Sequence, residues 1–527
     1  MAPSIIGSLW TVVINPTTPV CALLLFISLV LFFRLGKRRR PVGSLPPSPR
    51  GLPLIGNLHQ VTATPHEGLH ALSLKYGPLL FMRFGAIPHF VISSGELVRE
   101  VVKTHDAIFT YRTTTKASRV LFSESEDLLC SPQNKFWRLT RKLCVNELLS
   151  NKMVKSFQFI REEEVGRLVK TIGSSCINNI GSEIDLSKLF VKLAGSLVSR
   201  AVLGLKSAEE GGRESDEKMG KLAMEAVHII TDLFSFEDYI PALAWVDHLT
   251  GLNRKLKKTS RAINEFLDRV IDEHEMFNNG GEEGNDSQND RKCFVRVILD
   301  LRKKDMMGLE LTRGNIRSIL LDMFLAGIGS SASSTEWNMA ELARNPRIMK
   351  KVQEEVRSVV GEKSKIDESD IDQMKYLKCV IKESLRLHGP TVTIREASTT
   401  ASIGGFKLPD KTIALINIWA IHRDPNTWER PLEFLPERFL DTSYNFTGQD
   451  QVYFPFGLGR RVCPGVQFAM SEIEYALANL LCWFDWELPK GMAPEDLDMR
   501  GTSSIAAHKI VPLCLVPVSV KVSAPHR

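Results

Sequence analysis

The sequence predicts a mainly α-helical fold with small β-sheets. Most segments after residue 65 have the period and length of helices, and the short strand-like runs between them show neither βαβ alternation nor an internal repeat. Of the 527 residues, 43% are hydrophobic and 24% are charged, which is typical of a folded globular chain. We therefore expect a single large domain behind an apolar N-terminal segment.

That segment, residues 1–35, is expected to be a transmembrane anchor helix. No charged side chain occurs from Ala2 to Phe33, and the apolar run is followed by Arg34 and the basic cluster KRRR at 37–40. A membrane-crossing helix needs about 20 apolar residues. A cleaved signal peptide is the alternative, but here the positive charges follow the apolar run and no small-residue cleavage site comes after it. The positive-inside rule then places the rest of the chain in the cytosol.

Residues 36–57 are expected to form a basic stop and a proline-rich hinge, and residues 58–527 the cytosolic domain. Prolines prevent helix continuation and favour a stiff extended spacer; here they are Pro41, Pro46, Pro47, Pro49 and Pro53.

Within the domain, strand-like runs occupy 78–94, 411–419 and 509–517, and helical patterns occupy 347–363 and 374–388. The polar, glycine-rich stretch at 278–290 is expected to be a surface connector.

Charge and cysteine content exclude several classes of protein. The net charge of +6 is a mild excess and gives little support to a nucleic-acid partner. The nine cysteines are odd in number and widely spaced, and no CxxC or CxxCH occurs. A disulfide framework, a zinc ribbon and covalently attached c-type haem therefore lose support.

The stretch FPFGLGRRVCPG at 454–465 contains the residue with the strongest chemical context, Cys463. A lone cysteine is usually a small buried hydrophobe. Here its glycines let the backbone pass close to a flat surface, and Pro464 stops local helix formation. Arg461 can neutralise an anion, and an apolar helix is expected from residue 466, so Cys463 lies near a helix N-terminus that stabilises a thiolate. This combination favours an axial ligand of haem iron.

At this point the chain resembles the cytochrome P-450 superfamily, in particular its plant microsomal members. The family pattern F-x-x-G-x-R-x-C-x-G is met by Phe456, Gly459, Arg461, Cys463 and Gly465. The resemblance runs from about Pro46 to the C-terminus. It implies the cytochrome P-450 fold and haem b, with the Cys463 thiolate as the metal ligand.

Further motifs of the family follow in the right order. Glu383 and Arg386 match E-x-x-R, and Arg438 lies in the P-E-R-F segment; the resemblance implies that these three form a structural lock behind the haem. Trp137 and Arg141 match W-x-x-x-R. The resemblance assigns to haem binding the residues Trp137, Arg141, Arg395, Phe456, Arg461 and Gly465.

The sequence GIGSSA at 327–332 formally matches the G-x-G-x-x-[GA] pattern of dinucleotide-binding folds. It lacks a βαβ unit and a convincing ribose-binding acid. Instead, no proline occurs from Arg313 to Asn345, about 33 residues or roughly 50 Å of helix. The apolar residues before Gly327 fall on one helical face. The pattern therefore predicts a long buried helix.

By resemblance, this helix crosses the distal face of the haem, where the family usually has [AG]-G-x-[DE]-T-[TS]. Ala326 and Gly327 fit and would leave room for substrate, but Gly329 replaces the acid and Ser330 the threonine. Ser330 and Gly329 are the predicted catalytic positions. Either water or another side chain delivers protons and hydroxylation proceeds, or the reaction is an oxidative cyclisation, coupling, desaturation or rearrangement.

The remaining expectations concern the substrate. The run LHGPTVTIRE, which ends at Glu396, is about two residues shorter than usual in the family. The segments that the resemblance places around the substrate are apolar or carry small hydroxyls. Such a lining favours a lipophilic substrate of the terpenoid, alkaloid or phenylpropanoid type. The predicted pocket residues are Ala326, Gly327, Thr391, Val392, Thr502 and Ser503.

No flavin or nicotinamide site is visible in the sequence. The resemblance therefore implies electrons from NADPH–cytochrome reductase, with cytochrome b5 as an optional second donor, at the endoplasmic reticulum membrane. Arg138, Lys142 and Arg460 are candidate docking residues. The competing classes are a haem-thiolate isomerase or dehydratase, a nicotinamide-dependent dehydrogenase and a non-catalytic haem carrier.

Overall fold

A computed structural model describes residues 45–122, 126–205, 222, 225–226, 229, 234–279, 293–304, 311–442, 444–446, 452–502 and 507–520. The predicted anchor, the KRRR cluster, most of the 278–290 connector and Ser503 lie outside these residues. Within them, no helix is both long and apolar enough to cross a membrane.

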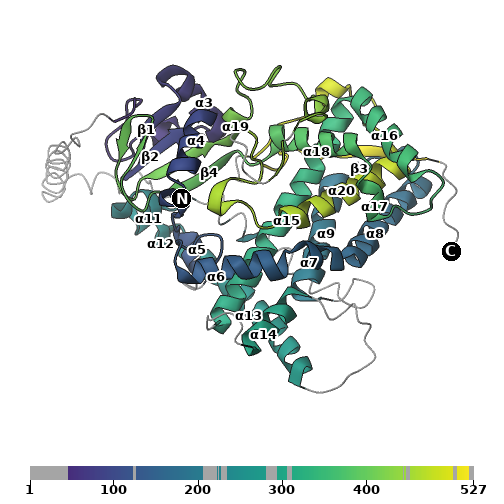
Figure 1. The fold of residues 1–527 in the computed structure, drawn as a ribbon, viewed down its shortest axis with the longest axis horizontal. Helices are drawn as coiled ribbons and strands as arrows, with labels where there is room; N and C mark the ends of the chain where they lie inside the picture. The colour runs from purple at the N-terminus through teal and green to yellow at the C-terminus, as the bar shows by residue number, and fades with distance from the viewer. Residues whose placement is uncertain are drawn as a thin grey trace, which may run out of the picture.

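The predicted fold class is confirmed, because helices dominate and the sheets are small (Figure 1). The longer helices are α3 (Pro65–Tyr76), α4 (Gly95–Thr104), α6 (Lys135–Leu143), α8 (Gln158–Asn178), α9 (Leu186–Val198), α13 (Leu252–Asn279), α14 (Phe294–Lys303), α15 (Arg313–Arg344), α16 (Pro346–Val360), α18 (Lys375–His388) and α20 (Val466–Trp483). The shorter ones are α5 (Lys116–Leu121), α7 (Asn151–Ser156), α11 (Phe236–Tyr239), α12 (Val246–Leu249), α17 (Glu368–Ile371) and α19 (Ile418–Ile421).

The strands form three sheets. They are β1 (Leu79–Phe84), β2 (Ile87–Ile92), β3 (Ile184–Asp185), β4 (Val392–Glu396), β5 (Ala401–Ile403), β6 (Phe406–Leu408), β7 (Ile413–Asn417), β8 (Phe484–Glu487) and β9 (Cys514–Ser519). The largest sheet has the order β1-β2-β7-β4, with β2 and β7 parallel and the other pairs antiparallel. The three strand-like runs of the sequence supply β1 and β2, β7 and β9, as predicted.

Helix α15 runs between the two ends of the molecule. Figure 1 shows β1, β2 and β4 with α3 and α19 at one end, α8, α16 and α17 at the other, and α15 between them. Its N-terminus is fixed by a capping box, in which the Thr312 hydroxyl accepts from the amide of Asn315 and the Asn315 side chain accepts from the amide of Thr312. The 32-residue length confirms the long helix and rules out a phosphate-binding loop at 327–332.

The glycine at 327 has a packing role in this helix. A Cβ added to Gly327 would lie 2.8 Å from Cγ2 of Val198, the last residue of α9. The absence of a side chain therefore lets α9 and α15 approach closely. The resemblance implied that Gly327 leaves room for substrate. In the structure, the side chain of Val198 occupies the space beside Gly327 instead.

Helix α15 also contacts α20, where Ser331 faces the buried carboxyl of Glu472. Burial raises the pKa of Glu472 to about 8, while the Ser331 hydroxyl and the more distant Arg161 lower it. The folded protein therefore keeps this carboxyl neutral over a pH range in which the unfolded chain ionises it.

This contact predicts a pH-dependent stability. Because the folded pKa is raised, the free energy of unfolding falls as the pH rises from 4.5, the ordinary value for Glu, to about 8. Glu472→Gln should remove this loss and stabilise the protein at about pH 8 relative to wild type by roughly 2–4 kcal/mol. Urea midpoints at both ends of the range measure it. Glu147→Gln, at an exposed position, is the control; equal midpoint shifts in both variants would contradict the prediction.

Candidate haem site

The loop around Cys463 is shaped by glycines and by hydrogen bonds to the cysteine. Gly457 and Gly459 adopt φ of +78° and +62°, which side chains rarely tolerate. A Cβ on Gly459 would also collide with the carboxylate of Asp106. The amide of Cys463 donates to the carbonyl of Phe456 at 2.9 Å, and the amide of Gly465 donates to the Cys463 sulfur. The loop therefore holds the sulfur just ahead of α20.

The exposure of Cys463 at a deeply buried position indicates an internal space beside this residue. The residue is surrounded by protein deeply enough for burial to raise the pKa of its thiol, yet its side chain remains exposed. On α15, Ala326 and Ser330 are exposed in the same way, although most of the helix around them is buried. These two residues lie one helical turn apart, and the Ser330 hydroxyl donates to the Ala326 carbonyl at 2.6 Å.

Two other cysteines influence the same charged groups but differ from Cys463. Cys130 and Cys144 are buried, and burial raises the pKa of both thiols, that of Cys130 to about 12. Both are therefore kept as neutral thiols. Burial raises the pKa of Cys463 as well, but the amide of Gly465 and the charges of Arg141 and Arg112 oppose that rise.

Four arginines place positive charge beside this space: Arg112, Arg141, Arg395 and Arg461. Burial holds the pKa of Arg395 well below its usual range, and repulsion from Arg112 and Arg461 lowers it further. Burial and the neighbouring arginines lower the pKa of Arg461 to about 9. Such a cluster is unfavourable unless an anion neutralises it.

Two of the four arginines have nitrogens without a partner among the described residues. They are Nε of Arg112 and Nη1 of Arg395, both buried. Nη2 of Arg395 donates to the carbonyl of Leu458 at 3.2 Å, and Nη2 of Arg141 donates to that of Val462 at 2.6 Å. The arginine cluster therefore has donors left over for an anionic group.

Two of the predicted haem-binding side chains, Trp137 and Arg461, already donate to protein acceptors. The indole of Trp137 donates to the Leu128 carbonyl at 2.9 Å. The guanidinium of Arg461 lies 4.0 Å from the centroid of the Trp137 ring. Its nitrogens donate to the carbonyls of Thr110, Leu128 and Ser131. Propionate binding by Trp137 and Arg461 thus stays a prediction from the resemblance, whereas the structure gives both a part in fixing the loop before α6.

Arg112 was not singled out by the sequence. It lies in the run TYRTTT after Phe109, in a segment that the resemblance placed at the substrate pocket without selecting any single residue. One signal could have found it, namely an arginine in a segment expected to border a haem that carries two carboxylates.

The predicted substrate residues occupy several elements. Val392 is half-buried on β4, and Thr391 just before the strand is buried. Thr502 is half-buried, and its hydroxyl accepts from the amide of His508 at 3.0 Å. The more exposed side chain of this part of β4 is Ile394, which the sequence did not select.

The predicted triad comes together away from Cys463. Glu383 is fully buried and accepts from Nε of Arg386 at 2.8 Å and from Nε of Arg438 at 3.0 Å. Arg386 also donates to backbone carbonyls, including that of His422 at 2.6 Å. These contacts join α18 to the segment that ends in Arg438.

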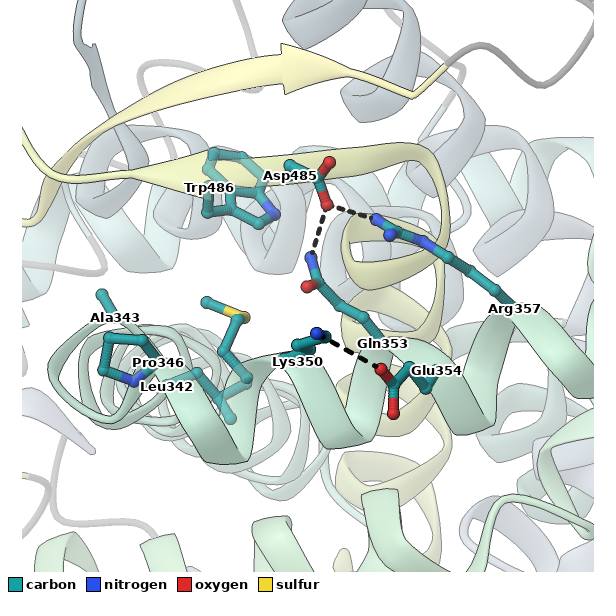
Figure 2. A pocket seen from close by; sticks show the side chains of 10 residues that line it. Leu342, Ala343, Pro346, Lys350, Gln353, Glu354, Arg357, Asp485 and Trp486 are labelled. Atoms are coloured by element: carbon teal, nitrogen blue, oxygen red, sulfur yellow. Dashed lines mark hydrogen bonds and ion pairs between the residues drawn. The ribbon is translucent and has the colours of Figure 1, made fainter.

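A separate surface hollow of about 440 Å³ lies between α16 and β8. Figure 2 shows Gln353 and Arg357 both reaching Asp485 across it, at 3.3 and 2.7 Å. None of the predicted site residues lines it. Its charged groups pair with one another, and it is not the candidate site.

Comparison with known proteins gives the same fold. The family model for cytochrome P450 matches residues 46–512. The chain belongs to the cytochrome P450 family. It is 42% identical to a phenylacetaldehyde oxime monooxygenase of Prunus mume, covering 94% of each chain, and 43% identical to cytochrome P450 71A1 of Persea americana, covering 94% of this chain and 98% of the relative.

More distant comparisons agree. A strychnine-11-hydroxylase of Strychnos nux-vomica is 40% identical, over 90% of this chain and 91% of the relative. A zebrafish cytochrome P450 structure with abiraterone has a TM-score of 0.72 at 22% identity, covering 87% of this chain and all of that chain. The chain is thus a plant-type haem-thiolate monooxygenase that oxidises a small molecule with electrons from a redox partner.

The residues present fit haem. Its two propionates would add anions to the carboxylates of Asp106, Asp127 and Asp322, which only partly offset the four arginines. Nε of Arg112 and Nη1 of Arg395, which have no partner among the described residues, would supply donors. The exposed sulfur of Cys463 would meet the iron.

This fit predicts that Arg395 slows the dissociation of haem from the protein. Arg395→Met removes a charge-assisted hydrogen bond worth about 1.5–3 kcal/mol. Haem should therefore leave the protein roughly 10- to 100-fold faster. Transfer of haem to an acceptor globin measures the rate, with the exposed Arg430→Met as control. Equal rates in the two variants would show that Arg395 does not bind the cofactor.

Proposed function

We propose that the protein is a membrane-bound monooxygenase that oxidises a lipophilic plant specialised metabolite, with terpenoids and alkaloids favoured. The observation that carries this proposal is Cys463, exposed although protein surrounds it, beside buried arginines that still have hydrogen-bond donors without a partner among the described residues. Relatives named as an oxime monooxygenase, a norfluorocurarine oxidase and a strychnine-11-hydroxylase support the substrate class.

In this proposal, the haem-binding residues have distinct tasks. Cys463 would hold the iron, and Arg112, Arg141 and Arg395 would bind the propionates. When bound, the haem supplies the activation of dioxygen, helped by electron donation from the thiolate. Ala326 would leave room for substrate, and the hydroxyl of Ser330 would orient a water near the reacting atoms.

A second candidate reaction rests on Gly329, which carries no acid. Oxidative cyclisation, coupling, desaturation or rearrangement depends less on proton delivery than hydroxylation does. Cyclisation, coupling and desaturation remove hydrogen and release both oxygen atoms as water, whereas hydroxylation leaves one in the product. Labelled dioxygen therefore separates these reactions from hydroxylation by product mass.

The cellular setting is also part of the proposal. Residues 1–35 would anchor the protein in the endoplasmic reticulum membrane, residues 36–57 would be the stop and hinge, and residues 58–527 would face the cytosol. NADPH–cytochrome reductase would be the redox partner, and cytochrome b5 a second donor. Arg138, Lys142 and Arg460 are exposed, as docking requires, and Arg460 also pairs with Asp106 at 3.3 Å.

Expression of the full chain in microsomes with the reductase tests the function. Plant terpenoids and alkaloids are screened by mass spectrometry for NADPH-dependent products. We expect an oxygenated product from a lipophilic compound. Turnover without reductase would favour an isomerase or dehydratase, and a thiolate spectrum without any product across the screen would contradict the substrate class.

A further inference from the structure

A monooxygenase consumes protons, and helix α15 offers none near Ser330. One oxygen atom of dioxygen enters the substrate and the other leaves as water, so each turnover takes up two protons with two electrons. From Met323 to Thr335 the helix has no titratable side chain. At its flanks, Asp322 accepts from the amide of Leu128 at 2.6 Å, and Glu336 pairs with the Ser187 hydroxyl. The proton source must therefore come from another element.

The imidazole of His508 lies against the helix at this point. A Cβ built on Gly329 would be 3.5 Å from Nε2 and 3.6 Å from Cε1 of His508. These are ordinary contact distances, so the ring covers the side of the helix that Gly329 leaves bare. Ser330, the next residue, is exposed to the internal space.

The position of His508 is fixed from both sides. Its amide donates to the Thr502 hydroxyl at 3.0 Å, and its carbonyl accepts from the Thr502 amide at 2.7 Å. The preceding residue, Ala507, accepts at its carbonyl from the hydroxyl of Ser333 at 2.7 Å and from the indole of Trp337. The backbone of His508 is thereby tied to the turn of α15 that follows Ser330.

Residues close to His508 in the chain are exposed to solvent. His508 is half-buried, and Ile510, two residues on, is 53% exposed. The amide of Ile510 donates to the carbonyl of Arg500, whose side chain is exposed. The charged and titratable groups around this region are Lys509, Asp498 and Arg500 beside His508, Glu336 and Glu341 on α15, and Glu472 on α20, whose buried carboxyl faces Ser331.

We propose that His508 supplies protons to the Ser330 side of the site. This proposal rests on the proposed function. In it, His508 is a positioning residue that acts through Ser330. An N–H of the imidazolium gives its proton to a water bonded to the Ser330 hydroxyl, and the neutral imidazole takes a new proton from solvent. Electrons still come from the redox partner, so the step moves protons only.

The test replaces the imidazole and then restores an acid. His508→Gln keeps a polar side chain of similar length but does not titrate. In full-length, haem-loaded protein with reductase, we expect substrate turnover to fall about tenfold with KM unchanged. This loss is smaller than the loss of a general acid usually causes, because water can still deliver protons. Peroxide released per NADPH should rise, and the limb of the pH profile between about pH 5 and 8 should disappear.

The double variant Gly329→Asp with His508→Gln provides the rescue. An acid on α15 at the same place should recover most of the coupling between NADPH and product. The exposed His248→Gln is the matched control and should behave as wild type. A purely space-filling role for His508 would leave peroxide release and the pH profile unchanged in His508→Gln, and would overturn the proposal.

A readout independent of turnover is the histidine resonance in the NMR spectrum of the haem-loaded protein. His508 is assigned by its loss in His508→Gln. In Gly329→Asp, the new carboxylate should raise the pKa of His508. An unchanged pKa would refute the contact even if no substrate has been found, which separates this proposal from the proposed function. If His508→Gln fails to fold, His508→Phe supplies the assignment.

Discussion

Cys463→Ala is expected to abolish the thiolate band of the ferrous carbon-monoxide complex, and all monooxygenase turnover with it. Cys463 is exposed in the loop before α20, and its sulfur accepts a hydrogen bond from the Gly465 amide. Alanine supplies no electron pair to the iron, and thiolate donation is what favours cleavage of the bond between the oxygen atoms. The loss should therefore be complete rather than partial.

The protein itself should survive this change. Because the Cys463 side chain is exposed to an internal space, its removal leaves no packed cavity, and the cost that follows large-to-small changes in a core does not apply. Secondary structure by circular dichroism should match wild type. Cys514→Ala, at a half-buried position on β9, is the control and should retain the band. A thiolate band that persists in Cys463→Ala would assign the iron to another cysteine.

The sequence predicted best where chemistry is local. The loop at 454–465 brings Cys463, Arg461 and the start of α20 together within a dozen residues, so spacing alone indicates their relation. The long helix α15 was equally accessible, because the absence of proline and the apolar face act over neighbouring turns.

What the sequence could not show depends on segments far apart in the chain. Arg112 and Arg395 are separated by nearly three hundred positions, and only the fold reveals that their buried charges repel each other. His508 lies against Gly329 in the same way, although the two residues are far apart in the chain. The acceptors of Trp137 and Arg461 are backbone carbonyls, which carry no residue signature.

Glu383→Ala is expected to destabilise the protein by about 3–5 kcal/mol, which is enough to unfold most of it in cells. Glu383 is fully buried and receives hydrogen bonds from Arg386, Arg438 and the amide of Leu435. Its removal leaves the buried guanidinium of Arg386 without a counter-charge. A urea midpoint and the yield of haem-loaded protein measure the effect.

The exposed Glu429→Ala is the matched control, because Glu429 pairs with Arg430 at 3.7 Å in solvent, where an ion pair contributes little. Equal midpoints for the two variants would contradict a structural role for the triad.

A double variant separates the unpaired charge from the lost packing. If the cost of Glu383→Ala comes mainly from an uncompensated Arg386, then Glu383→Leu combined with Arg386→Leu should be less damaging than the sum of the two single changes, because no buried charge is left alone. Arg386 also donates to the carbonyls of His422 and Pro431, at 2.6 and 2.8 Å, and these acceptors would lose their donor in the double variant. The double variant should therefore remain less stable than wild type. If the double variant were as stable as wild type, the hydrogen bonds from Arg386 to the carbonyls of His422 and Pro431 would contribute nothing to stability.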